Sequence, residues 1–223
     1  MKRQRMTAAE RRELILDEAR RAFSRYGFDG TRTWEIARTV QVSEALIYRH
    51  FPTKRALYRA VLRRTIREQD ANYEAVGLKD ISPGGLVRNL RAYFAVAAGH
   101  GPEEIREGFR LLLASVAGDA SYASLIYRRA NRIMNDRVHR ALLLAQEQGD
   151  LIGRVLSARN TSMFTEHIGT MMNTLLAQSD QARPYAGDRD SVIEEAVWFC
   201  CRGLGFTEEA IARHLAVAPA EDT

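Results

Sequence analysis

The sequence predicts an all-α fold of about nine helices, and three observations lead to that prediction. Apolar residues recur every three or four positions through most of the 223 residues, as they do on one face of a helix. No stretch alternates apolar and polar side chains as a half-buried strand does, and no internal repeat occurs. Two short helical patterns in residues 31–51 flank a break of three or four residues, which is typical of a helix-turn-helix.

Composition is that of an ordinary globular protein, with 46% hydrophobic and 27% charged residues. No apolar run approaches the roughly 18 residues that a membrane span needs, and no apolar segment follows the N-terminal MKRQRM. We therefore expect a cytoplasmic protein without a membrane partner. Cys200 and Cys201 are too few for a disulfide framework and lack the spacing of a zinc site, so buried free thiols are expected.

Charge is distributed unevenly along the chain. Residues 1–67 contain 17 Lys and Arg against 7 Asp and Glu, whereas residues 68–223 contain 16 against 21. Because phosphate contacts supply most non-specific affinity for DNA, this asymmetry favours a DNA-binding head on an acidic body. An alternative is that arginine-rich helices present a solvated face, but this would not explain why the basic excess coincides with the helix-turn-helix.

The first expected helix runs from Ala8 to Tyr26. Gly27, which can adopt positive φ, is expected to end it, and Thr31 or Thr33 can begin the next helix. Together with the helix-turn-helix it would form a three-helix head whose core contains Phe28, Ile36, Ile47 and Phe51. One face of the first helix is predicted to carry Leu14, Ile15, Ala19, Ala22, Phe23 and Tyr26, and the other face arginines and glutamates.

The second helix of the motif is predicted to begin after Ser43, whose hydroxyl has the chemistry of an N-cap. Leu46 and Ile47 would point inward, and the opposite side would enter the major groove of DNA. The remaining expected helices span residues 54–73 (after the Thr53 cap), 86–98, 102–116, 120–148 (ended by Gly149), 161–178, 191–202 and 207–215.

A set of short motifs follows one order and spacing through residues 15–62. The motifs are Ile15-Leu16 with Ala19 and Phe23, Gly27-Phe28, Glu35-Ile36-Ala37, Val42-Ser43, and Ile47-Tyr48-x-x-Phe51-x-x-Lys54-x-x-Leu57. In these motifs, residues 15–62 resemble the N-terminal DNA-binding domain of the TetR family of bacterial transcriptional regulators (TetR/AcrR type). The resemblance implies a helix-turn-helix DNA-binding domain in residues 1–53 and a helical ligand-binding and dimerisation domain in residues 54–223.

The same resemblance, carried over position by position, implies a set of DNA-binding residues. Hydroxyls at helix starts and a lysine at the next helix start would contact phosphates, and the front of the second helix would face base edges, where arginine can bind guanine. The Tyr48 ring could instead simply seal the small core. The candidate residues are Thr33, Trp34, Ser43, Glu44, Ala45, Tyr48, Arg49, His50 and Lys54.

Three positions depart from the family pattern. Gln41 stands where glycine is usual, so either glutamine adopts the left-handed conformation or the turn is rebuilt. Glu44 stands at the front of the second helix, where it would repel phosphate but could accept from cytosine N4, so we expect altered operator preference. Arg32 occupies a place that a threonine or serine cap often holds.

The resemblance further implies a small-molecule pocket and a homodimer interface in the body. Large aromatics among polar groups are the expected pocket lining, although each could be an ordinary core residue. The last two long helices carry more apolar surface than one internal face needs, as an isologous interface requires. The candidate pocket residues are Tyr93, Phe94, Phe109, Arg110, Tyr122, Tyr127, Asn131 and Met134. The candidate dimer residues are Phe164, Ile168, Met171, Met172, Leu175, Val192, Ala196, Phe199 and Cys200.

The leading interpretation is a sequence-specific homodimeric repressor that a small-molecule effector releases from a near-palindromic operator, and activation is possible on the same architecture. An alternative is an architectural DNA-binding protein without ligand control. No nucleophile–base pair, phosphate loop or metal-ligand spacing is present, so we expect neither an enzyme nor a cofactor or metal.

Overall fold

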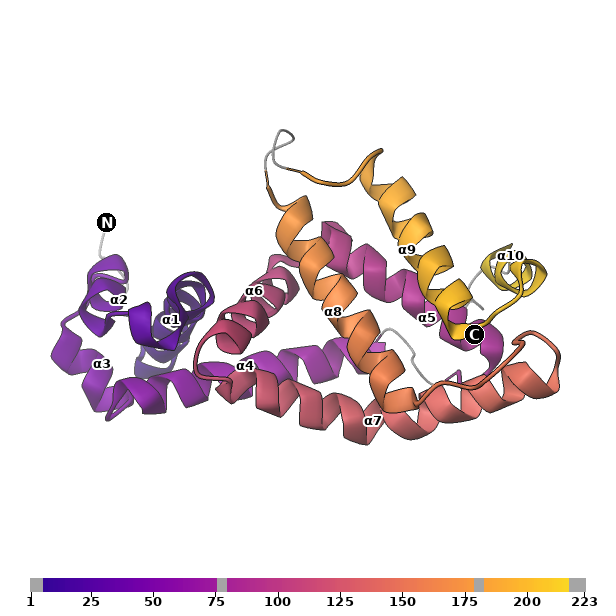
Figure 1. The fold of residues 1–223 in the computed structure, drawn as a ribbon. Helices are drawn as coiled ribbons and strands as arrows, with labels where there is room; N and C mark the ends of the chain where they lie inside the picture. Colours follow the sequence, from indigo (N-terminus) through magenta and orange to yellow (C-terminus); the bar gives the residue numbers. More distant parts are fainter. Residues whose placement is uncertain (1–5, 76–79, 179–182, 217–223) are drawn as a thin grey trace. The chain divides into compact units, whose positions relative to one another are not determined.

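The computed structural model describes residues 6–75, 80–178 and 183–216, and within them the chain forms ten α-helices, one of them extended by a π-helical turn (Figure 1). The all-α prediction is confirmed, and the number of helices is close to the expected count of about nine. The helices are α1 (Ala8–Gly30), α2 (Thr33–Thr39), α3 (Glu44–His50), α4 (Lys54–Ala75), α5 (Pro83–Ala95) with the π-turn η1 (Val96–His100), α6 (Glu103–Ala117), α7 (Ser121–Glu147), α8 (Ala158–Leu176), α9 (Arg189–Leu204) and α10 (Glu208–Ala216).

The chain packs as two compact units. The first contains Met1–Ala71 and Glu107–Ser124, and the second contains Asn72–Arg106 and Leu125–Thr223. Three helices, α4, α6 and α7, therefore contribute residues to both units. The functional boundary expected after residue 53 stays a prediction.

The first unit is built on the buried face of α1. Ile15, Ala19 and Phe23 are completely buried, whereas Leu14 is 36% and Tyr26 is 52% exposed. The buried stripe of α1 is therefore narrower than the apolar face predicted from the sequence. The core also contains buried side chains from α2, α3, the C-cap of α3 and α4, namely Ile36, Ala37, Ile47, Phe51, Leu57 and Val61.

Gly27 ends the regular part of α1 as predicted. It has φ +68° and ψ −179°, and α1 continues beyond it only after a break. The hydroxyl of Thr31 donates to the carbonyl of Gly27 at 2.7 Å and closes this corner. The corner places Thr33 as the first residue of α2, one of the two starts expected from the sequence.

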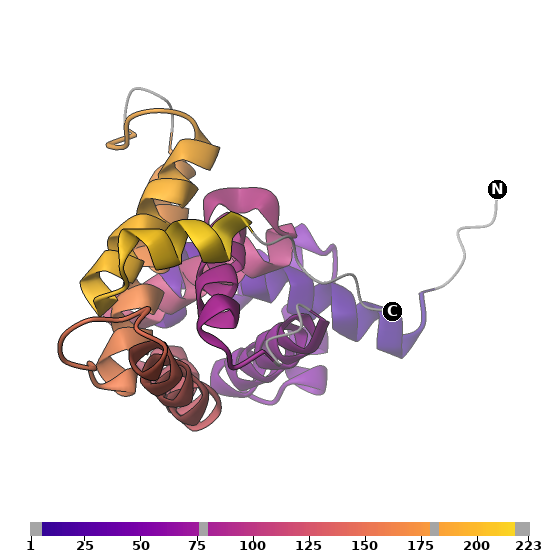
Figure 2. The same ribbon diagram turned by 90° about the vertical axis from the view of Figure 1, so that its right-hand side faces the viewer.

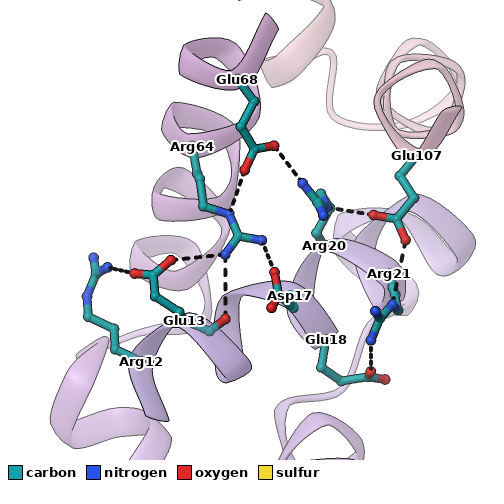
Figure 3. Close-up of polar contacts among 9 residues, drawn as sticks. All are labelled: Arg12, Glu13, Asp17, Glu18, Arg20, Arg21, Arg64, Glu68 and Glu107. Atoms are coloured by element: carbon teal, nitrogen blue, oxygen red, sulfur yellow. Dashed lines mark hydrogen bonds and ion pairs between the residues drawn. The ribbon is translucent and has the colours of Figure 1, made fainter. Parts of the chain in front are cut away.

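Ion pairs fix α1 to α4 and α6 within the first unit (Figure 3). Arg20, almost fully buried on α1, binds Glu68 of α4 through Nη1 and Glu107 of α6 through Nε, each at 2.6 Å. Arg64 of α4 reaches back to Asp17 of α1 at 2.5 Å and to Glu13 at 3.1 Å. The network holds three helices together with charges rather than with apolar contacts alone.

The second unit has a core formed by α5, α7, α8, α9 and α10. Figure 2 shows it from the side on which α10 packs against α5 and α9. Phe94, Leu142 and Val197 are completely buried at its centre. A close approach joins α5 to α8, since a Cβ on Gly169 would come within 3.0 Å of the Tyr93 ring.

A polar connection fastens α10 in the second unit. Gly149 (φ +77°) ends α7 as predicted, and the next residue, Asp150, is buried. Its carboxylate binds His214 Nε2 at 2.7 Å and also binds Arg213, both on α10. Burial opposes ionisation, but the hydrogen bonds and charges of these two side chains hold the pKa of Asp150 below its usual value.

Among the described residues, no single helix is long and apolar enough to cross a membrane. Helices α6 and α7 satisfy the length and composition criteria only when taken together as a bent pair.

Candidate nucleic-acid interface

Helices α2 and α3 form the predicted helix-turn-helix. Gln41 has φ +56°, so glutamine itself adopts the left-handed conformation that the turn requires. The hydroxyl of Ser43 accepts from Leu46 N at 3.2 Å and caps α3 as expected. Ile47 is completely buried, and Ala45 and Arg49 are exposed. Helix α3 is thus anchored by one side and open on the other.

Three candidate residues are joined in one hydrogen-bonded chain. Thr33 Oγ1 donates to Glu44 Oε1 at 2.5 Å and lies 2.9 Å from the hydroxyl oxygen of Tyr48. A carboxylate only accepts hydrogen bonds and each hydroxyl has a single proton. The Thr33 proton is therefore used by Glu44, and Tyr48 donates to Thr33. The residues are brought together as a group, but through bonds to one another that the sequence did not reveal.

Exposure differs among the remaining candidates. Trp34 is 44% exposed and lies 5.5 Å from the guanidinium of Arg38. His50 is half-buried, its Nε2 is buried without a hydrogen-bond partner, and its ring centre lies 6.3 Å from that of Phe51. The His50 ring therefore packs against the three-helix head, whereas the Trp34 ring lies on the surface of the head.

Lys54, at the first position of α4, is held by two contacts. Its Nζ donates to the carbonyl of Asp29 at 3.2 Å and lies 4.8 Å from the centre of the Phe28 ring. The hydroxyl of Thr53 accepts from Ala56 N and caps the helix, as predicted. These contacts hold the ammonium beside the N-terminus of α4, where an anion would be favoured.

The ion-pair network of the first unit was not predicted from the sequence. A signal was present, because Arg20 lies beside Ala19 and three residues before Phe23 on the apolar face of α1. A charged residue on that face requires a buried partner. The partners, Glu68 and Glu107, lie 48 and 87 residues further on, and nothing in the sequence pairs them with Arg20.

The predicted pocket residues divide between the two units: Phe109, Arg110 and Tyr122 lie in the first, and the other five lie in the second. In the second unit, the hydroxyl of Tyr93 shares its proton between the backbone oxygen of Glu166, at 3.2 Å, and Oε2 of the same residue, at 3.1 Å. Burial raises the pKa of the Glu166 carboxyl. Phe94 belongs to the core, Asn131 and Met134 are half-buried, and Tyr127 contacts the ring of His167.

A cavity of about 640 Å³ lies between α5, α9 and α10 in the second unit. Its apolar part is formed mainly by Ile193, Val197, Trp198 and Leu215, and charged side chains from α5 and α9 stand at its rim. None of the eight predicted pocket residues lines this cavity, so the pocket set stays a prediction.

The predicted dimer residues on α8 and α9 differ in exposure. Phe199 is 70%, Phe164 is 61% and Met171 is 44% exposed. Ile168, Leu175 and Ala196 are half-buried. Met172, Val192 and Cys200 instead pack in the core of the same chain, which leaves the first three as the open apolar part of this surface.

Comparison with known proteins agrees with the helix-turn-helix. Residues 15–61 match the family model for bacterial regulatory proteins of the tetR family. The HTH-type transcriptional regulator RutR of Escherichia coli K12 is 43% identical over 65 residues, which are 29% of this chain and 30% of RutR. An HTH-type transcriptional repressor of Mycobacterium tuberculosis is 36% identical over 84 residues, 38% of this chain and 42% of the repressor. The match thus spans less than half the length of either relative.

Solved structures share the fold over nearly the whole chain. A bacterial regulatory protein of the tetR family from Rhodococcus RHA1 superposes with a TM-score of 0.67 at 18% identity, covering 89% of this chain and 99% of that protein. AibR, solved in complex with isovaleryl coenzyme A and operator DNA, superposes with a TM-score of 0.62 at 21% identity, covering 89% and 100%. Residues 15–61 thus match the tetR family of bacterial regulatory proteins, and 89% of this chain shares the fold of these solved structures.

Proposed function

We propose that this protein is a transcriptional regulator that binds operator DNA as a homodimer and represses transcription until a small molecule releases it. One observation carries the proposal: the helix-turn-helix is anchored through Ile47 and presents the other side of α3 to solvent. The helix-turn-helix belongs to residues 1–67, the part of the sequence that contains the basic excess. The names of RutR and of the mycobacterial repressor support the same role.

The DNA-binding part is tested by selecting bound fragments from genomic DNA at about 150 mM salt, where non-specific electrostatic binding is weak. We expect one enriched near-palindrome, because a two-fold symmetric dimer reads two inverted half-sites. Arg49→Ala should lower affinity for that site by about 1–3 kcal/mol if its guanidinium reads a guanine. Fragments without a shared motif would favour the architectural alternative instead.

The dimer is proposed to form through the exposed apolar surface of Phe164, Met171 and Phe199. Light scattering of the full chain should give about twice the mass of 25.2 kDa. Phe199→Glu should shift the mass towards the monomer, because a carboxylate would be buried in the interface without a partner. Leu143→Glu, at a 40% exposed residue of α7, is the matched control and should remain dimeric.

Effector binding is proposed for the second unit, which contains the cavity and five of the predicted pocket residues. Because AibR was solved with isovaleryl coenzyme A, that ligand is the first to try, with free coenzyme A as its control. A ligand that acts as an effector should raise the melting temperature and weaken operator binding. Tight binding without any change in operator affinity would contradict the release mechanism.

A further inference from the structure

The structure assigns a second role to Glu44: its carboxylate occupies, in the DNA-free protein, the hydroxyl donors that would bind a DNA phosphate. This inference rests on the proposed function, because it concerns how the helix-turn-helix engages DNA. It differs from the expectation that Glu44 reads a cytosine. Glu44 is instead a positioning residue that DNA must displace.

The hydrogen bonds carry the argument. A phosphate oxygen can only accept, so Thr33 and Tyr48 can hold a phosphate only by donating their hydroxyl protons to it. Both protons are already used: Tyr48 donates to Thr33 at 2.9 Å, and Thr33 donates to Glu44 at 2.5 Å. Thr33 is buried and Glu44 half-buried, so water competes weakly for these bonds.

Charge acts in the same direction as geometry. Glu44 brings negative charge to the first turn of α3, on the side that would approach the DNA backbone. A phosphate at Thr33 would be repelled by this carboxylate, because Glu44 Oε1 lies 2.5 Å from the Thr33 hydroxyl. Displacing Glu44 must therefore lower affinity for every duplex, whatever its sequence, since the backbone is the same in all of them.

The test measures the affinity of the wild type and three variants for two duplexes over a range of salt concentrations. One duplex is the operator from genomic selection, and the other is a random sequence of equal length. The variants are Glu44→Ala, Glu44→Gln and the control Glu35→Gln. Glu35 lies in the first turn of α2, so its substitution removes the same charge from the same motif without touching the hydroxyl chain. Thermal melts of each variant verify the fold.

We expect Glu44→Ala to bind both duplexes about three- to tenfold more tightly, with a salt slope steeper by about one phosphate. Glu44→Gln should show a smaller gain, because its amide oxygen still accepts from Thr33, and Glu35→Gln should show the smallest gain. Loss of preference at a single base pair in Glu44→Ala would overturn the inference in favour of base reading. Unchanged affinity, or an equal gain in Glu35→Gln, would overturn it as well. A wild-type protein that binds neither duplex would refute the proposed function instead.

Discussion

Replacing Arg20 with methionine should destabilise the first unit strongly, because this guanidinium joins three helices (Figure 3). Its side chain is 6% exposed and that of Glu107 is 8% exposed, so the pair between them is shielded from water. Removing one partner of a buried pair costs about 3–5 kcal/mol. Arg21, 3.6 Å from the other carboxylate oxygen of Glu107, reduces that cost. Glu68 is 37% exposed, so its contact with Arg20 adds less than about 1 kcal/mol.

We therefore expect Arg20→Met to lower the free energy of unfolding by about 2–4 kcal/mol, measured by urea denaturation followed by circular dichroism. Arg12→Met removes an ion pair whose side chains are 43% and 54% exposed and a cation–π contact 5.1 Å from the centre of the Phe51 ring, and should cost about 1 kcal/mol. The double variant Arg20→Met/Glu107→Met removes both buried charges and should recover much of the loss. A cost for Arg20→Met no larger than that of Arg12→Met, or a double variant less stable than the single, would refute this reasoning.

Three further predictions concern the second unit. Gly169→Ala should lower the free energy of unfolding by about 1–3 kcal/mol, because the new Cβ would overlap the Tyr93 ring. Gly203→Ala, which has open space around it, should raise the free energy of unfolding by about 0.5–1 kcal/mol. Thermal melts of both variants test this. Burial raises the pKa of Cys200 to about 11 and that of Cys201 to about 12, so iodoacetamide at about pH 8 should modify neither until urea unfolds the protein. The pKa of Asp150 is lowered in the folded state. Its carboxylate therefore stabilises the fold fully at pH values above about 3.9, the pKa of an aspartate in the unfolded chain, and this stabilisation is lost as the pH falls through the lower pKa of the folded state. Asp150→Asn should therefore reduce the loss of stability on acidification, and melts with the same acid dependence as wild type would contradict this.

The sequence by itself determined the helices and the DNA-binding motif. Helical periodicity, the Ser43 cap and the Gly27 break act over a few residues, so a single stretch of chain contains all the information that they need. The signature of the helix-turn-helix is local for the same reason. Even the unusual Gln41 could be recognised as a residue that must take a left-handed conformation or change the turn, and it takes that conformation.

Contacts between distant residues were decided only by the tertiary structure. Periodicity identifies an apolar face but not how much of it is buried, so it did not show that Leu14 and Tyr26 stay exposed. Arg20 could be recognised as unusual, yet its acidic partners depend on how α4 and α6 pack on α1. The sequence likewise does not show that Glu44 has a hydrogen-bond partner, because Thr33 lies eleven residues away and the bond forms only once the turn has folded. Two side chains interact only if they are close in space, and their spacing along the sequence predicts that distance only within one helix or turn.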